Sequence, residues 1–224
     1  MINRMNYLNK IRRCHSIIKG DIIETPIQLN KRLSDIYKAR IYFKREDLQT
    51  TRSFKIRGSL NKIKSLSKHD INNTNGVICA SAGNHAQGVA YSCNKLNIKG
   101  NIFVPKKTPL QKINRIRHYG KDNININLYG NNFDECLAEA KHVSEKENRI
   151  FIHPFDDYEV INGQATIAYE ILTKTIPDIV ICCVGGGGLI SGISKYCKLI
   201  NNNIRIVGVE PEGAPCLTES LKVD

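Results

Sequence analysis

Four consecutive glycines at positions 185–188 are the pattern in this sequence most suggestive of a binding site. They follow the apolar run 179–184 and precede a helical pattern, so they leave backbone N–H groups bare where a helix begins. Such a cradle binds anions, and phosphate is its usual occupant. A tight turn needs only one or two glycines, because each further glycine costs conformational entropy. The motif is neither G-x-G-x-x-G nor G-x-x-x-x-G-K-[ST], so it does not indicate a dinucleotide or ATP.

A second segment, residues 79–88, also joins a strand pattern to a helix pattern. Its small residues, together with the polar Ser81 and Asn84, suit a carboxylate held by backbone amides. An alternative, in which Ser81 simply caps the helix, fits the same letters equally well. Lys55 lies in a third segment, Arg52-Ser53-Phe54-Lys55-Ile56-Arg57-Gly58, but its position alone does not distinguish it from the other lysines.

The elements that must position these residues alternate along the chain. Short apolar runs predict strands at 41–43, 77–80, 102–104, 124–128, 150–152, 179–184 and 204–209. Helical spacing predicts helices at 54–66, after Gly83, from Pro109, at 134–147, at 159–174 and after the glycine run. Strands separated by helices of this length indicate βαβ units. We therefore expect an α/β fold with open, mainly parallel, twisted sheets flanked by helices.

The 224 residues carry 33 Lys and Arg against 21 Asp and Glu, a formal charge of +12. The excess lies in residues 1–70, with 17 basic and 6 acidic residues, whereas residues 71–224 carry 16 and 15. A basic chain can bind nucleic acid, but no recognised binding module is present. Ile, Asn and Lys make up about a third of the chain, which favours AT-rich codon bias as the cause. We expect no nucleic-acid partner and no membrane partner, because no apolar run reaches the length of a membrane span.

The eight cysteines are scattered, with no C-x-x-C pair and no zinc-like spacing. They are expected to be buried thiols in a reducing compartment, which predicts a cytoplasmic protein. The first 20 residues hold five basic residues and no acids, which permits an organellar transit peptide. The alternative is an ordinary packed helix with Ile11, Ile17 and Ile18 on one face.

Taken together, these segments resemble the fold-type II pyridoxal-phosphate enzymes, which share the tryptophan synthase β-like fold, and more narrowly the threonine dehydratases (threonine ammonia-lyases). The resemblance covers roughly residues 8–224. It is carried by Lys44-Arg45-Glu46-Asp47-Leu48-Gln49, by Ser53-Phe54-Lys55-Ile56-Arg57-Gly58, by 80–88, by Phe151-Ile152-His153-Pro154-Phe155-Asp156-Asp157, by Gly185-Gly186-Gly187-Gly188-Leu189 and by Val209-Glu210-Pro211.

This resemblance implies a role for each site residue, with pyridoxal 5'-phosphate as cofactor. Lys55 forms a Schiff base with the cofactor aldehyde and moves the substrate α-proton, while Phe54 packs beside the cofactor ring. Asn84 donates to the ring hydroxyl. The phosphate is held by Gly185, Gly186, Gly187, Gly188 and the Leu189 amide, and the substrate carboxylate by Ser81, Ala82, Gly83, Asn84 and His85. The implied reaction converts L-threonine to 2-oxobutanoate and ammonia in isoleucine biosynthesis, with L-serine as a second substrate.

Two departures from related enzymes narrow the expectation. Serine racemases of this fold carry a second serine after Ser81, where this chain has Ala82, which cannot move a proton. Serine racemase activity is therefore the less favoured interpretation. Some relatives bind a divalent metal after the Val-Glu-Pro strand, where Cys216 replaces an aspartate beside Glu210 and Ala214. Because Mg²⁺ and Ca²⁺ prefer oxygen ligands, we expect no metal site.

By the same resemblance, residues 51–154 form a small domain, and 1–50 with 155–224 form the large cofactor-binding domain. Catalytic domains of the family continue for roughly another hundred residues, so the large domain is expected to be incomplete. The leading hypothesis is that the protein is a threonine dehydratase, which acts on an amino-acid substrate. The alternatives are a non-catalytic remnant and one half of a split enzyme that needs a complementing C-terminal fragment. A homo-oligomer is left open.

Overall fold

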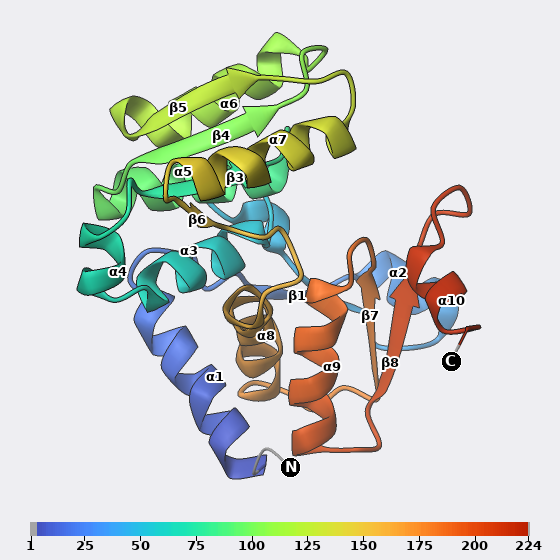
Figure 1. The fold of residues 1–224 in the computed structure, drawn as a ribbon. Coiled ribbons are helices and arrows are strands. Elements are labelled where there is room, and N and C mark those ends of the chain that lie inside the picture. The colour runs from blue at the N-terminus through green and yellow to red at the C-terminus, as the bar shows by residue number, and fades with distance from the viewer. Residues whose placement is uncertain (1–3, 224) are drawn as a thin grey trace.

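The structure of the protein, a computed structural model, describes residues 4–223 as helices and strands in alternation (Figure 1). In the first half these are α1 Arg4–Ile18, β1 Ile27–Leu29, α2 Lys31–Tyr37, β2 Tyr42–Lys44, the 3-10 helix η1 Glu46–Leu48, α3 Lys55–Ser65, α4 Lys68–Asn72, β3 Val77–Ala80, α5 Asn84–Leu96 and β4 Gly100–Val104. The second half contains α6 Leu110–Gly120, η2 Lys121–Asn123, β5 Ile124–Leu128, α7 Phe133–Lys146, β6 Ile150–Phe151, α8 Tyr158–Leu172, β7 Ile179–Cys183, α9 Gly188–Ile200, β8 Arg205–Val209 and α10 Cys216–Ser220.

One four-stranded sheet has the order β5-β4-β3-β6, and all its neighbouring strands run parallel. Its central strand β3 is buried along its whole length, because helices cover both faces. Cys79 packs with α5 and α6 on one face. Ile78 and Ala80 pack with α7 on the other face. The upper part of Figure 1 shows this layered arrangement. Burial on both faces explains why β3 is apolar without alternation.

A second region, in the lower part of Figure 1, contains two separate strand pairs. Strands β7 and β8 pair in parallel, whereas β1 and β2 pair in antiparallel orientation. The apolar cluster of this region joins α1, α8 and α9 around Ile11, Ala165 and Tyr196. The α/β class and the mainly parallel pairing expected from the sequence are confirmed, but in the described residues two separate strand pairs stand in place of a second continuous sheet.

Helix α3 joins the two regions, packing against α5 of the four-stranded sheet and against α8 of the second region. The contact with α8 is close because two glycines face each other. A Cβ atom added at Gly163 would lie 2.5 Å from the Arg57 carbonyl oxygen and 2.7 Å from the Cα atom of Gly58. The small residues therefore set the separation of the two helices and hence the position of α3.

Several local expectations need correction. Of the isoleucines expected on one face of α1, Ile11 and Ile18 are fully buried, but Ile17 is exposed. All eight cysteines are free, yet Cys183 and Cys216 are exposed rather than buried. The short elements β1, α2, α4 and α10 were not expected, because they are too short to show a period. Within residues 4–223, the helices lack the length and hydropathy needed to cross a bilayer.

We predict that Gly163→Ala destabilises the protein, because its new methyl group meets backbone atoms of α3 that cannot move aside independently. The free energy of unfolding should fall by about 1–3 kcal/mol in a urea titration. Gly20→Ala is the matched control, since a Cβ atom there meets nothing within 4 Å. Equal stabilities of the two variants would contradict this account of the contact between α3 and α8.

Candidate active site

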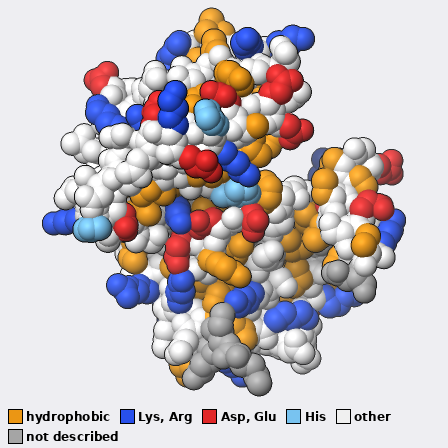
Figure 2. Space-filling model, in the orientation of Figure 1, with side chains coloured by type: hydrophobic (Ala, Val, Ile, Leu, Met, Phe, Trp, Pro, Cys, Tyr) orange, Lys and Arg blue, Asp and Glu red, His pale blue; other side chains and the backbone are white. Residues whose placement is uncertain are grey.

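Residues 152–155, directly after β6, are the point at which the three predicted site segments meet. The imidazole Nε2 of His85 lies 2.9 Å from the Ile152 carbonyl oxygen. The ammonium of Lys55 donates to the Pro154 carbonyl oxygen at 2.7 Å. The glycine run packs on Phe155, so that a Cβ atom at Gly186 would lie 2.3 Å from that ring. Segments distant in sequence thus converge on one short loop, beside the surface hollow seen in Figure 2.

Lys55 is the first residue of α3 and is partly buried. Burial lowers the pKa of its ammonium, and the nearby Cys183 works in the opposite direction. None of the ion pairs formed within residues 4–223 involves Lys55. A lysine whose pKa falls has a larger neutral fraction, and the neutral amine is the nucleophile. The setting therefore suits attack on a carbonyl carbon.

The four glycines divide into two kinds. Gly186 and Gly188 must lack a side chain because Phe155 occupies that space; a Cβ atom at Gly188 would lie 2.7 Å from the Phe155 carbonyl oxygen. At Gly185 a Cβ atom would meet nothing within 4 Å, and at Gly187 it would only touch the Ser191 hydroxyl at 4.0 Å. Gly187 also has a φ of +82°, a conformation that favours glycine. Two of the glycines thus serve packing, and two border open space.

The same loop leaves backbone donors free. Among the backbone hydrogen bonds of residues 4–223, none uses the amide of Gly185, Gly186, Gly187 or Leu189. Helix α9 begins at Gly188, so its dipole adds positive potential at this end. Unpaired amides at a helix start, with open space beside them, fit a phosphate group. The predicted cradle therefore has the geometry that phosphate binding needs.

The second predicted loop has a similar form. Helix α5 begins at Asn84, and its N-cap is Gly83, which makes no side-chain cap. Ser81 is not the helix cap; instead its hydroxyl accepts from the Gly83 amide at 3.2 Å. The amides of Ala82, Asn84 and His85 form no hydrogen bond within the described part of the chain. The Asn84 side chain is exposed, so it is free to contact a ligand.

His85 is placed differently from the other loop residues. Its side chain is buried and points to the Ile152 carbonyl oxygen, away from solvent. Burial lowers the pKa of His85 to about 3, so the imidazole is neutral at physiological pH. Of the groups of His85, therefore, only the backbone amide is available to a carboxylate, because the imidazole connects α5 to the loop after β6.

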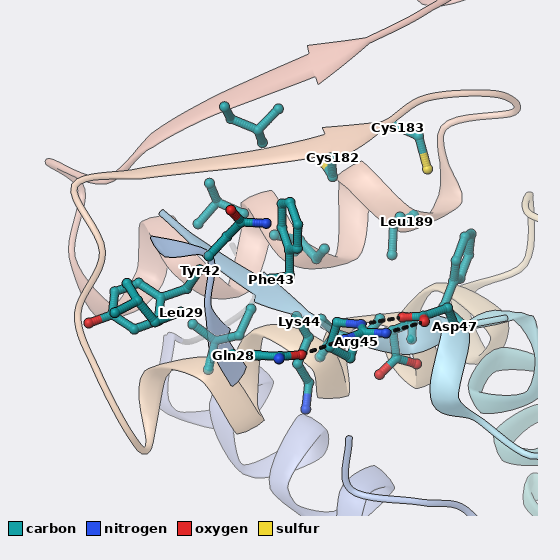
Figure 3. A pocket seen from close by; sticks show the side chains of 18 residues that line it. Gln28, Leu29, Tyr42, Phe43, Lys44, Arg45, Asp47, Cys182, Cys183 and Leu189 are labelled. Carbon is teal, nitrogen blue, oxygen red and sulfur yellow. Dashed lines mark hydrogen bonds and ion pairs between the residues drawn. The ribbon is translucent and has the colours of Figure 1, made fainter. Parts of the chain in front are cut away.

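Phe54 and Leu189, the remaining predicted site residues, line a cavity of about 620 Å³ (Figure 3). The Lys55 ammonium lies 5.5 Å from the centroid of the Phe54 ring, within cation–π range. Figure 3 shows Leu189 and Cys183 at one end of the cavity and Phe43 nearer its middle. Phe54 therefore connects the lysine to this cavity, in which its ring also packs with the core around α9.

Arg57, two residues beyond Lys55, is fully buried and satisfies all five of its N–H donors. It binds Glu46 through Nε and Nη2, both at 2.8 Å. It binds Glu170 through Nη1 at 2.6 Å and Nη2 at 2.9 Å, and its last donor reaches the Thr166 hydroxyl at 3.1 Å. Lys44 adds a second cation, 2.5 Å from a Glu170 oxygen. Two cations and two carboxylates thus form a buried ion network, which includes Arg57 of the first turn of α3.

This network controls the charge of its members. Burial alone would raise the pKa of Glu170, but the neighbouring His15, Arg57 and Lys44 outweigh it and lower that pKa to about 2. Burial alone would lower the pKa of Arg57. The carboxylates of Glu46 and Glu170 outweigh burial and raise that pKa. Both groups are therefore ionised throughout the physiological range.

Sequence reasoning did not select Arg57, Glu170, Pro154 or Phe155 as site residues. Their contacts join positions about 100 residues apart, which local spacing does not reveal. The Glu210 carboxylate, considered for a metal site, instead accepts from the amides of Leu217 and Thr218 at 2.8 and 2.9 Å and so caps α10. Within residues 4–223, no cluster of three metal-ligating side chains is found.

The family model described as "Pyridoxal-phosphate dependent enzyme" matches residues 18–224. The L-threonine dehydratase biosynthetic IlvA of Bacillus subtilis is 47% identical over 222 residues, which covers 98% of this chain and 52% of that protein. The chain thus spans about half the length of the curated relatives it matches.

Two solved structures extend the likeness to the fold. The processed form of threonine deaminase isoform 2 from Solanum lycopersicum superposes with a TM-score of 0.89 at 42% identity, over 98% of this chain and 62% of that one. The maize serine racemase superposes with a TM-score of 0.89 at 31% identity, over 96% of this chain and 64% of that one.

We predict that Glu170→Gln lowers the free energy of unfolding at neutral pH, because it removes a carboxylate that offsets two buried cations. The folded pKa of Glu170, about 2, lies below its unfolded value near 4.5. Its contribution of about 3 kcal/mol is therefore present above pH 4.5 and is lost as the pH falls toward 2.

Urea titrations across this pH range check the prediction, with the exposed Glu212→Gln as control. The stability difference between wild type and Glu170→Gln should shrink as the pH falls below about 4.5. A difference that does not change with pH would show that the carboxylate charge is not what the network uses.

We also predict that Gly185→Asp weakens phosphate binding at least tenfold without loss of stability. The new side chain enters open space, but its negative charge stands in the cradle. Gly213→Asp, where a Cβ atom likewise meets nothing within 4 Å, is the matched control. Titration with inorganic phosphate, followed by calorimetry, measures both; equal affinities would place the phosphate site elsewhere.

Proposed function

The chain belongs to the family of pyridoxal-phosphate dependent enzymes, and from that premise we propose that it is the catalytic part of an enzyme that converts L-threonine to 2-oxobutanoate and ammonia. This family's cofactor is pyridoxal phosphate, as the sequence predicted. The observation that carries the proposal is the meeting of Lys55, the glycine run and the loop at 81–85 around residues 152–155. The high identity to biosynthetic threonine dehydratases supports threonine as the substrate.

The residues present fit the cofactor. Free amides beside open space at Gly185 and Gly187 fit its phosphate. The partly buried amine of Lys55 fits its aldehyde, with Phe54 beside it. Asn84, exposed at the start of α5, is the side chain that would reach the ring hydroxyl. Each contact uses a group that the rest of the described chain leaves available, except that Lys55 must release the Pro154 carbonyl oxygen.

When bound, pyridoxal phosphate supplies an electron sink for the pair left behind when the substrate loses its α-proton. Lys55 is the base that accepts that proton, and its lowered pKa makes the neutral amine more accessible. The amides of Ala82, Asn84 and His85 would hold the substrate carboxylate and so fix the α-carbon near Lys55. The β-hydroxyl leaves as water and one water is consumed in releasing ammonia, so the overall reaction balances.

Ala82 supports elimination over racemisation. A racemase must deliver a proton to the opposite face of the substrate, and a methyl side chain carries none. Ala82 packs partly buried against the core of the four-stranded sheet. We propose L-serine as a slower substrate, because it presents the same α-proton and β-hydroxyl. The likeness to the maize serine racemase supports the shared fold and leaves this assignment unchanged.

The same proposal includes the organisation and setting of the protein. Residues 51–154 would form the small domain, and 1–50 with 155–224 the cofactor-binding domain. The placement of α3 between α5 and α8 is consistent with a cleft at their junction. Eight free cysteines and the biosynthetic relatives support a cytoplasmic enzyme of isoleucine biosynthesis.

We predict that Lys55→Ala abolishes covalent attachment of pyridoxal phosphate. Wild-type protein incubated with the cofactor and reduced with borohydride should gain one cofactor adduct at Lys55, found by peptide mass spectrometry. Lys112→Ala, an exposed lysine on α6, should keep the adduct. Modification of other lysines with equal yield in the Lys55→Ala variant would contradict the assigned role.

Substrate turnover tests the activity itself. Formation of 2-oxobutanoate from L-threonine should depend on the cofactor and fall at least 1,000-fold in Lys55→Ala, since a general base and covalent attachment are lost together. A cofactor adduct without turnover, either for this chain or for its assembly with the missing half of a relative, would contradict the proposed reaction.

A further inference from the structure

His153 lies in the loop after β6 and accepts two hydrogen bonds from the backbone that follows it. Its Nδ1 atom accepts from the Asp156 amide at 2.7 Å and from the Phe155 amide at 3.3 Å. A backbone amide can only donate, so Nδ1 must carry a free electron pair, and in the neutral ring the proton is on Nε2. The bonds resemble those of an Asx turn, in which an asparagine or aspartate oxygen accepts from the backbone just beyond it.

One peptide unit, between Pro154 and Phe155, connects this imidazole to the Lys55 ammonium. The N–H group of the unit is the Phe155 amide that donates to His153. Its C=O group accepts from the Lys55 ammonium at 2.7 Å. Because a peptide unit is planar, these two groups cannot turn independently. In a trans peptide they point in opposite directions, so the imidazole and the ammonium bind opposite sides of one rigid unit.

The imidazole also contacts the aromatic ring on which the glycine run packs. The rings of His153 and Phe155 meet edge to face, with their centroids 4.7 Å apart. The Phe155 ring in turn occupies the space that a side chain at Gly186 would need. His153 therefore acts, through neighbouring groups, on both the amine and the loop to which we assign the cofactor phosphate.

We infer that His153 is a positioning residue: its neutral imidazole orients the peptide unit after Pro154 and thereby holds the Lys55 amine beside the glycine run. The inference rests on the proposed function for the cofactor that Lys55 would attach, and it adds what aligns the amine beforehand. Hydrogen bonds in a chain polarise one another, so an acceptor at the N–H group strengthens the carbonyl oxygen as a partner for the ammonium. Loss of that acceptor frees the peptide unit to rotate and releases Lys55.

This arrangement exists only while Nδ1 of His153 is unprotonated. Burial lowers the pKa of His153 from its ordinary value of 6.5. The carboxylates that face the ring raise this pKa and the cations lower it; these groups are Asp156, Lys141 of α7, Asp157 and Lys55 of α3. His85, the other imidazole at this loop, has a pKa of about 3 and stays neutral. As the pH falls below 6.5, His153 therefore gains a proton before His85 does, and Nδ1 then ceases to accept.

Two substitutions at this position separate the acceptor from the titrating ring. His153→Asn places a side-chain oxygen close to the position of Nδ1, so it keeps an acceptor and removes the group that titrates near neutral pH. His153→Leu has a similar branched shape but offers no acceptor. His142→Leu, at an exposed position of α7, is the matched control.

The first measurement uses the cofactor-free protein and needs no activity. Competitive acetylation with trace reagent, followed by peptide mass spectrometry, reports the reactivity of each lysine. At neutral pH, Lys55 should react about threefold faster or more in His153→Leu than in wild type, because it loses a hydrogen bond that favours its charged form. His153→Asn and His142→Leu should match wild type. Lys44, buried in its ion pair with Glu170, is the internal reference for general loosening.

The second measurement follows the rate at which pyridoxal phosphate attaches to Lys55 as the pH is lowered. His153→Leu should attach the cofactor about tenfold more slowly at neutral pH, because the amine is no longer aligned. The rate of wild type divided by that of His153→Asn should be constant above pH 6.5 and should fall below it, since only wild type loses its acceptor. A residue that served stability alone would not give this difference in pH profile.

Three results would overturn the inference: unchanged reactivity of Lys55 in His153→Leu, an equal rise in reactivity at Lys44, or a ratio of wild type to His153→Asn that does not change with pH. The acetylation needs no cofactor, so it is independent of the proposed function. The expected change in Lys55 reactivity, with no cofactor attachment in any variant, would uphold the restraint by His153 and contradict the proposed function. Attachment and threonine turnover with unchanged Lys55 reactivity would do the reverse.

Discussion

The buried guanidinium of Arg57 is the interaction on which the rest of the site depends. It is held by carboxylates from η1 and α8, and the lysine of β2 shares one of them, so that four elements meet at one cation. Removing any charged member would leave an uncompensated charge in a dry interior, which is strongly unfavourable. Because Arg57 and Lys55 lie on the same helical turn, this constraint also fixes the amine for which we propose the catalytic role. Close contact at Gly58 and Gly163 brings the two helices near enough for the network to close.

The loop at 152–155 gives the site a second constraint, made of backbone rather than charge. Its carbonyl oxygens hold His85 and Lys55, and the ring of Phe155 shapes the glycine run. Neutral His85 is suited to this structural role, because an imidazolium in so buried a place would be costly. Phe155 therefore occupies the space that side chains at positions 186 and 188 would need. Residues 185–189 contain no lysine, so the basic excess of residues 1–70 is not part of the phosphate site that we propose.

The sequence was sufficient to predict the alternating elements and the two loops that follow strands, because strong apolar periods and glycine runs act locally. The run of four glycines was interpreted as a phosphate cradle as a whole, whereas Gly186 and Gly188 are required by packing on Phe155. Lys55 was recognisable only through family resemblance, since its partner Pro154 is 99 residues away. Arg57 was missed for the same reason: a buried ion network depends on residues that only the folded chain brings together. Short elements such as β1 and α2 have too few residues to show a period.

The sequences of strands β3 and β7 reflect the burial of each strand as well as its extended conformation. Both are short apolar strands that pair with parallel neighbours. Each is followed by a loop of small residues, after which a helix begins. In β3 every side chain is buried, because the sheet continues on both edges and helices cover both faces. In β7 alternate side chains are exposed, and within residues 4–223 β8 is its only strand partner. An isolated surface strand would be expected to alternate polar and apolar residues. The unbroken apolar run of β7 is therefore consistent with burial on both faces, and the described residues supply only one of them.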